Sequence, residues 1–216
     1  MSERPHRHGF DIDDVLYPSA SAMLARYEEL YGVQVNHAQW YNTTDLTIWG
    51  VDDANERSHR INSISNDPDF IESFRPVEGA QEALEAHRTR GDILAAITGR
   101  PSGEHAPTDL GPMTRYMLQR DFPGIFPEES VFFTSHFAPD AAHRITKLSL
   151  ARQLELNRFT EDFLEHANPM AAAAIRVYLF DSQWNQEGAH ESLVRVKGWS
   201  EHVIKATEID DEQRAA

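Results

Sequence analysis

This 216-residue sequence lacks several features, and each absence excludes a class of protein. It contains no cysteine, which excludes a disulfide scaffold, thiolate catalysis and a cysteine-ligated zinc or iron–sulfur site. No apolar run is long enough to span a bilayer, and the N-terminal segment lacks the apolar core of a signal peptide. We therefore expect a cytoplasmic protein without a membrane partner. His6 and His8 are expected to belong to a frayed end rather than to a metal site.

Positive charge is also scarce, with 20 lysines and arginines against 35 aspartates and glutamates and a formal net charge of -15. This balance opposes broad binding to nucleic acid polymers or anionic lipids. It is compatible with a small-molecule phosphate ester as partner, because one metal ion and one lysine can reverse the field locally. The length allows one domain with an insertion. The oligomeric state is left open, a homodimer included.

Short apolar runs alternate with longer amphipathic stretches, which predicts an α/β fold with a Rossmann-like parallel sheet flanked by helices. Residues 33–74 differ, because they are polar and aromatic with helical periodicity, and they predict a small helical insertion. We expect strands at residues 9–12, 93–97, 131–133, 163–164, 177–180 and 193–196, the last at an edge of the sheet.

Polar side chains follow several of these runs. Asp11 and Asp13 end the first, and Thr98, Gly99 and Arg100 end the second. Lys147 opens a later helix, and Glu165 with His166 follows the run at 163–164. Ligands of an open α/β sheet bind at the carboxyl ends of its strands, so these residues are the candidate site.

Phosphoryl transfer needs this combination of groups. Asp11 can attack phosphorus and form an aspartyl-phosphate. Asp13, two residues on, lies on the same side of an extended chain and can protonate the leaving oxygen and then activate water. We expect neighbouring acids to raise each other's pKa and so favour the protonated form. Thr98, Lys147 and Mg²⁺ would stabilise the charge on the phosphoryl oxygens. Lys147 stands out because the other two lysines, Lys197 and Lys205, follow every candidate acid.

The ordered set of Asp11-x-Asp13, Thr98, Lys147 and a later acid resembles motifs one to four of the haloacid dehalogenase superfamily, within it the 5'(3')-deoxyribonucleotidase-like group. Further segments carry the resemblance over nearly the whole chain: Trp40-Tyr41-Asn42, Asp45-Leu46, Phe74-x-Pro76-x-x-Gly79-Ala80, Leu179-Phe180-Asp181 and Trp184-Asn185. The resemblance implies a core domain of residues 1–18 and 75–216, and a helical cap of residues 19–74 over the active site.

Two positions depart from the family pattern. Asp14 stands where many relatives have glycine, and aspartate also suits a turn. The family usually has two adjacent acids in motif four, whereas Glu165 is followed by His166, a poor ligand for magnesium. We therefore assign the metal to Asp11, the carbonyl of Asp13 and Glu165. Asp181 is as consistent with a turn or cap residue as with a site residue.

Specificity would come from the cap. Tyr17, Trp40, Tyr41 and Trp49 are candidates for stacking on a nucleobase, although for any one of them packing within the cap is the favoured role. Gly99 and Arg100 would join them in substrate binding, with an outward salt bridge as the alternative for Arg100. The leading hypothesis is a magnesium-dependent 5'-nucleotidase. The alternatives are a phosphatase for another small phosphate ester and a weakly active or non-catalytic nucleotide-binding relative.

Overall fold

The computed structural model describes residues 5–40, 45–104, 106–135 and 144–215, with side chains described up to residue 209. Six parallel strands form one sheet in the order β3-β2-β1-β4-β5-β6. Their bounds are β1 Arg7–Phe10, β2 Ile93–Thr98, β3 Val131–Phe133, β4 Arg158–Glu161, β5 Arg176–Phe180 and β6 Val194–Val196. The predicted α/β fold with a flanked parallel sheet is confirmed, and β6 is an edge strand as expected.

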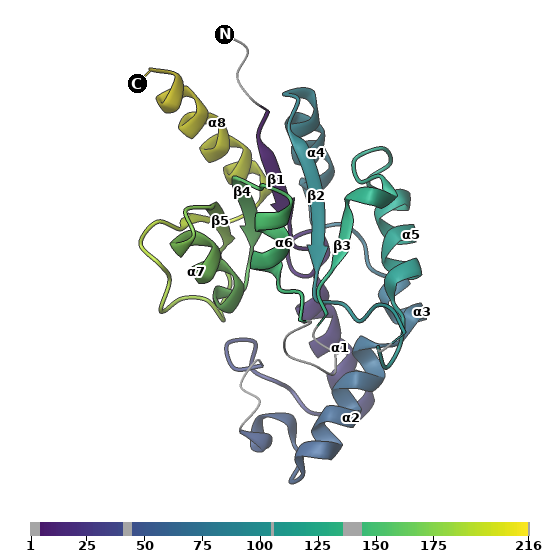
Figure 1. The fold of residues 1–216 in the computed structure, drawn as a ribbon. Helices are drawn as coiled ribbons and strands as arrows, with labels where there is room; N and C mark the ends of the chain where they lie inside the picture. The colour runs from purple at the N-terminus through teal and green to yellow at the C-terminus, as the bar shows by residue number, and fades with distance from the viewer. Residues whose placement is uncertain (1–4, 41–44, 105, 136–143, 216) are drawn as a thin grey trace.

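Helices cover both faces of this sheet (Figure 1). One face packs against α4 (Ala80–Thr89), α5 (Gly111–Asp121) and α8 (Trp199–Ala215). The other packs against α6 (Lys147–Gln153) and α7 (Leu164–Ala172). Alternate residues of β5 contribute to the two cores, because successive side chains of a strand point to opposite faces. A short 3-10 helix, η2 (Glu128–Ser130), precedes β3.

The expected strand at residues 163–164 is wrong. The fourth strand, β4, lies five residues earlier, and Phe163 and Leu164 instead begin α7. Strand β4 escaped the search for apolar runs because its residues Arg158 and Thr160 are polar, although both are buried. The shift changes which acids stand at the carboxyl end of the sheet.

The inserted segment forms its own small cluster of helices beyond the carboxyl ends of the strands (Figure 1). It contains α1 (Ser19–Tyr31), the 3-10 helix η1 (Leu46–Trp49), α2 (Ala54–Ser65) and α3 (Pro68–Glu72). Met23, Tyr27, Trp49 and Ile64 are buried together there, and the Tyr27 hydroxyl donates to the carbonyl of Trp49. Trp49 is therefore a packing residue of this cluster. The exact domain boundaries stay a prediction.

No helix in the described ranges combines the length and apolar character needed to cross a bilayer.

Candidate active site

The candidate nucleophile, Asp11, lies directly after β1. Its N–H donates to the carbonyl of Thr160, which continues the pairing of β1 with β4 by one residue. Gly9 permits this close pairing, because a Cβ there would lie 2.6 Å from the Phe159 ring. The Asp11 side chain is 7% exposed, and its Oδ1 accepts the N–H of Ile12. The position and hydrogen bonds of Asp11 are thus fixed by two neighbouring strands.

Lys147 bridges two acids at this point. Its Nζ lies 2.7 Å from Asp11 Oδ2 and 2.9 Å from Glu161 Oε2, and all three side chains are buried. Burial alone would lower the pKa of Lys147, but the two carboxylates outweigh it and hold the pKa above its usual range. The lysine therefore carries a permanent positive charge beside the candidate nucleophile.

Three buried acids meet at this end of the sheet: Asp11, Glu161 and Asp162, with one carboxylate oxygen of each lying within 4.8 Å of the others. We call these the acidic group. Burial, followed by the charge of Glu161, raises the pKa of Asp11 and the pKa of Asp162. One lysine cannot balance three ionised carboxylates. The group therefore offers the hard oxygen donors that suit Mg²⁺, and a bound cation would favour their ionised form.

Sequence reasoning missed Glu161 and Asp162. They form the adjacent acidic pair that motif four of the resembled family requires, whereas Glu165 is an exposed residue of α7 outside the acidic group. The assignment of Glu165 as a metal ligand is corrected accordingly, and His166 no longer marks a departure. The signal was present in the sequence as two consecutive acids after the β-forming pair Phe159 and Thr160.

Two residues after β5 hold Asp162 in place. The indole N–H of Trp184 donates to Asp162 Oδ2 at 2.9 Å, and the amide of Asn185 donates to the Asp162 carbonyl at 2.7 Å. Asp181, at the end of the same strand, instead pairs with Arg195 at 2.8 Å. Of the two interpretations of Asp181, the structure supports a turn residue rather than a site residue.

The second aspartate, Asp13, is bound by Arg100. Nη2 of Arg100 lies 2.7 Å from Asp13 Oδ1 and its Nε lies 3.1 Å away, so the guanidinium contacts the carboxylate at two points. The Thr98 hydroxyl is 3.5 Å from Asp13 and accepts the N–H of Arg100. Burial would raise the pKa of Asp13, but Arg100 outweighs burial and lowers it. The expectation that close acids raise this pKa is therefore wrong for Asp13.

The hydrogen bonds of its side chain explain why Asp14 occupies a position in the turn that favours glycine. Its φ of 57° lies in the left-handed region that favours glycine. The side chain accepts the N–H of Ala20 at 3.0 Å and the hydroxyl of Ser19 at 3.0 Å. These bonds satisfy the first turn of α1 and offset the strained backbone.

A cavity of about 380 Å³ connects this turn with the inserted helices. Its core side is lined by Asp13, Gly99 and Arg100, and its cap side includes Met23, Trp40, Ile61, Asn62, Phe70 and Phe74. Trp40 also contacts Trp184 edge to face at 5.8 Å, and its buried indole N–H has no hydrogen-bond partner in the described part of the chain. Trp40 thus joins the insertion to the residue that holds Asp162.

Two predicted residues, Tyr17 and Tyr41, have not yet been placed. Tyr17 is fully buried and its hydroxyl donates to Asp121 at 2.9 Å, so it has no free face for a nucleobase and its assignment to substrate binding is corrected. Tyr41 lies outside the described residues. The structure thus brings Asp11, Asp13, Thr98 and Lys147 together as predicted, and places Gly99, Arg100 and Trp40 around the adjoining cavity.

Comparison with known proteins bears on the fold. No family model matches the sequence, and no curated protein matches it. Solved structures do match. A hydrolase of the haloacid dehalogenase family from Deinococcus radiodurans, with bound phosphate and sodium, is 16% identical with a TM-score of 0.61, over 95% of this chain and 97% of the other. A predicted phosphoglycolate phosphatase from Haemophilus somnus is 14% identical with a TM-score of 0.60, over 96% and 100%.

A candidate beta-phosphoglucomutase from Thermotoga maritima is 17% identical with a TM-score of 0.56, covering 94% of this chain and 99% of the other. The chain has the haloacid dehalogenase fold. At these identities the likeness establishes the fold, and the activity has to be argued from the residues of the site.

Proposed function

We propose that the protein is a magnesium-dependent phosphomonoester hydrolase that acts on nucleoside monophosphates. The observation that supports this function most directly is the acidic group, in which Lys147 lies between Asp11 and Glu161. Such a site joins a buried nucleophile to a fixed cation and to a set of oxygen ligands. Asp11, Glu161 and Asp162 would hold Mg²⁺, which when bound neutralises charge on the phosphoryl oxygens.

The chain's own residues supply the remaining chemistry. An oxygen of Asp11 attacks phosphorus, the bond to the ester oxygen breaks, and the phosphoryl group is carried on the carboxylate. Asp13 gives its proton to the departing alkoxide, and afterwards takes one from the water that attacks the phospho-aspartate. Lys147 and the Thr98 hydroxyl stabilise the equatorial oxygens.

Arg100 has to release Asp13 before this acid can act. The guanidinium of Arg100 lies on the Asp13 carboxylate and holds its pKa below the usual range, which favours the ionised form. A phosphoryl dianion is a stronger partner for the same cation, because it offers three acceptor oxygens and more charge. Substrate binding would then draw Arg100 away and allow the pKa of Asp13 to rise. In this way the acid becomes protonated when a phosphate is present to receive its proton.

The cavity favours a nucleotide over glycolate or a sugar as the esterified group. The cap side is largely apolar and aromatic, with Trp40, Phe70 and Phe74 on its walls, and its amides are those of Asn62 and Asn66. A flat heterocycle buries these walls and can accept the unpartnered N–H of Trp40. A small, highly hydroxylated group would leave them unmatched.

A phosphate-release screen tests the proposal. The wild-type protein is assayed with Mg²⁺ against nucleoside monophosphates, sugar phosphates and phosphoglycolate, and nucleotides are expected to give the highest kcat/KM. The Phe70→Ala variant should raise KM for nucleotides and leave that for phosphoglycolate unchanged. Hydrolysis of sugar phosphates in preference to nucleotides would reject the substrate class, and no hydrolysis of any ester would reject the enzyme itself.

A further inference from the structure

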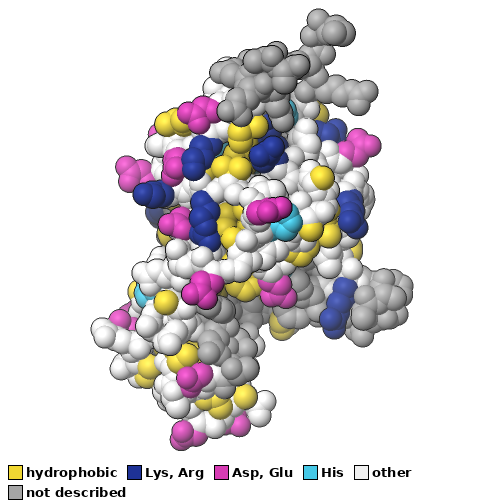
Figure 2. All heavy atoms as spheres, turned by 90° about the vertical axis from the view of Figure 1, so that its left-hand side faces the viewer, with side chains coloured by type: hydrophobic (Ala, Val, Ile, Leu, Met, Phe, Trp, Pro, Cys, Tyr) yellow, Lys and Arg dark blue, Asp and Glu magenta, His cyan; other side chains and the backbone are white. Residues whose placement is uncertain are grey.

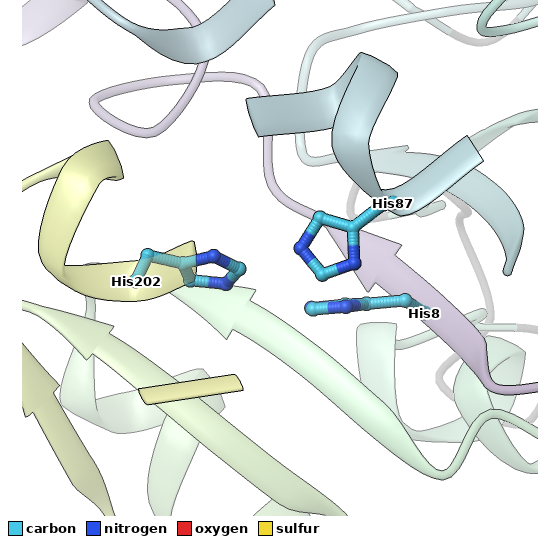
Figure 3. A group of neighbouring side chains, drawn as sticks. All are labelled: His8, His87 and His202. Atoms are coloured by element: carbon cyan, nitrogen blue, oxygen red, sulfur yellow. The ribbon is translucent and has the colours of Figure 1, made fainter. Parts of the chain in front are cut away.

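Three histidines from distant parts of the chain meet inside the core, on the face of the sheet covered by α4 and α8. His8 comes from β1, His87 from α4 and His202 from α8 (Figure 3). Each residue is 0% exposed. His8 is therefore a core residue of the first strand, and the expectation that it belongs to a frayed end is wrong. We call these three residues the histidine cluster.

One nitrogen of each ring is already occupied. His8 Nε2 and His202 Nε2 lie 2.8 Å and 2.9 Å from the hydroxyl oxygen of Thr160. His87 Nδ1 lies 2.7 Å from Asp92 Oδ2. A hydroxyl oxygen can accept two ring N–H groups and a carboxylate can accept a third, so these contacts are compatible with one proton on each of these nitrogens.

Arg90 also approaches His87, with Nη2 2.7 Å from Nδ1 and 3.5 Å from Asp92. The cation and the ring cannot both donate along the same line to that nitrogen. Arg90 can only donate and Asp92 can only accept, so Nδ1 either accepts from Arg90 or donates to Asp92. Metal binding through the opposite nitrogen requires the second arrangement, in which Arg90 pairs with the carboxylate.

The opposite nitrogens, Nδ1 of His8, Nε2 of His87 and Nδ1 of His202, are buried and lack a hydrogen-bond partner within the described ranges. When the proton of each ring sits on its hydrogen-bonded nitrogen, the opposite nitrogen carries a lone pair. Three buried ring nitrogens without a partner are unfavourable in a protein interior, where nearly all polar atoms are paired. A metal ion is the ligand that accepts three lone pairs at once.

The spacing of the rings fits such an ion. Their centroids are 4.9, 5.5 and 5.2 Å apart. With a zinc–nitrogen bond of about 2.0–2.1 Å, each centroid lies about 3.2 Å from the metal, and tetrahedral angles then separate centroids by about 5.2 Å. One ring nitrogen from each histidine already lies within 4.8 Å of the others, so small rotations bring them to bonding distance. The partners on the far nitrogens are those that orient metal-binding imidazoles.

We propose that His8, His87 and His202 form a structural zinc site, separate from the acidic group. Imidazole nitrogen suits zinc and related transition metals, whereas magnesium prefers oxygen. Burial, followed by the nearby positive groups, lowers the pKa of His8 and of His202 well below the ordinary value, which keeps the rings in the ligating form. Bound there, zinc would join the first strand to the last helix.

The site also lies close to the catalytic residues along the chain. His8 lies on β1, and Asp11, directly after this strand, follows it by three positions. Thr160, whose hydroxyl contacts two of the rings, directly precedes Glu161. Successive residues of β4 thus support the histidine cluster on one face and the acidic group on the other. We infer that zinc stabilises the strand ends that position the candidate active site.

Cobalt binding to the full-length protein tests this site, because cobalt replaces zinc and reports its coordination by visible absorption. Chelator-treated protein is titrated with Co²⁺ while excess Mg²⁺ occupies the acidic group. We expect one Co²⁺ per chain, with the strong absorption of a four-coordinate ion, displaced by Zn²⁺. Zinc at about 100 times its dissociation constant should raise Tm by about 5–10 °C.

His87→Phe keeps an aromatic ring and should weaken metal binding by more than about tenfold, with Asp92→Asn giving a smaller loss in a folded protein. His59→Phe, at an exposed histidine of α2, is the matched control and should bind as the wild type does. If wild-type protein shows no four-coordinate cobalt, the rings are only packing residues and the proposal is overturned. A cobalt signal that persists in His87→Phe but disappears in Asp162→Asn overturns it equally, because the ion would then lie in the acidic group.

Discussion

Replacing Asp162 by asparagine should raise the free energy of unfolding in the absence of magnesium. The same change should reduce the stabilisation that magnesium gives. Asp162 is buried beside Glu161 and Asp11, and burial followed by these two charges raises its pKa well above the ordinary value. Asparagine has nearly the same shape, and its amide oxygen can still accept the N–H of Trp184. The substitution therefore removes a charge and leaves the packing in place.

The sign follows from proton linkage. Asp162 keeps its proton in the native state at pH values where the unfolded chain has lost it, so its contribution is complete below about pH 4 and declines as pH rises toward the native pKa. One retained proton gives a slope of about 1.4 kcal/mol per pH unit between the unfolded and the native pKa. Without metal at pH 7, Asp162→Asn should therefore be more stable than the wild type, by about 1.4 kcal/mol for each pH unit over which the native carboxyl keeps its proton.

Magnesium acts against this advantage of the variant. At about 100 times its dissociation constant it adds about 2.7 kcal/mol to the wild type, and less to a variant that lacks one ligand. Urea unfolding at pH 5, 6 and 7, with chelator or with Mg²⁺, measures both effects. Asp52→Asn, at an exposed position of the insertion, is the control and should follow the wild type. An Asp162→Asn protein that is destabilised in chelator and still gains full stability from magnesium would refute the acidic group as the metal site.

Three further substitutions test the assignments of individual residues. Arg100→Met should raise KM and move the descending, alkaline limb of the kcat/KM profile to higher pH, because the pKa of Asp13 in the free enzyme rises when its cation is lost; an unshifted limb in a pH-rate series would contradict this. Tyr17→Phe should cost about 1 kcal/mol in urea unfolding and leave KM unchanged, since the hydroxyl serves Asp121; a nucleotide-specific rise in KM would restore its substrate role. Glu165→Gln should leave magnesium affinity unchanged in calorimetry, and a tenfold loss would return this residue to the metal site.

Local sequence patterns predicted much of the catalytic end of the sheet. Asp11, Thr98 and Lys147 each stand next to a clear apolar run or open an amphipathic helix, and their order along the chain carried the assignment. The topology then brings these ends together. The prediction worked because it needed only local periodicity and the parallel arrangement of strands.

The errors have a common physical cause. Strand β4 carries Arg158 and Thr160, polar residues whose burial is made favourable by partners from other parts of the chain. Likewise, the role of Tyr17 is decided by Asp121, which lies 104 residues further along. Such long-range pairing leaves no periodic signal in the sequence. For this reason strand β4 was missed, and Tyr17 was assigned to stacking on a nucleobase although it is buried.

Charges of both signs are mixed on the face of the molecule that Figure 2 shows. On the face shown in Figure 2, lysine and arginine side chains are interspersed with acidic and hydrophobic ones rather than gathered into one continuous basic surface. The charges that matter for a phosphate ester are instead buried, at Lys147 and Arg100.

Chemical trapping of the phosphorylated intermediate tests the central claim most directly. An aspartyl-phosphate is a mixed anhydride that borohydride reduces, so quenching a steady-state reaction with borohydride should convert Asp11 to homoserine, detectable by mass spectrometry of the peptide that contains it. We expect this product in the presence of substrate and Mg²⁺, and expect Asp11→Asn to give neither the product nor phosphate release. Continued hydrolysis by Asp11→Asn, or turnover of the wild type with reduction at another carboxylate, would contradict the assignment of Asp11 as the nucleophile.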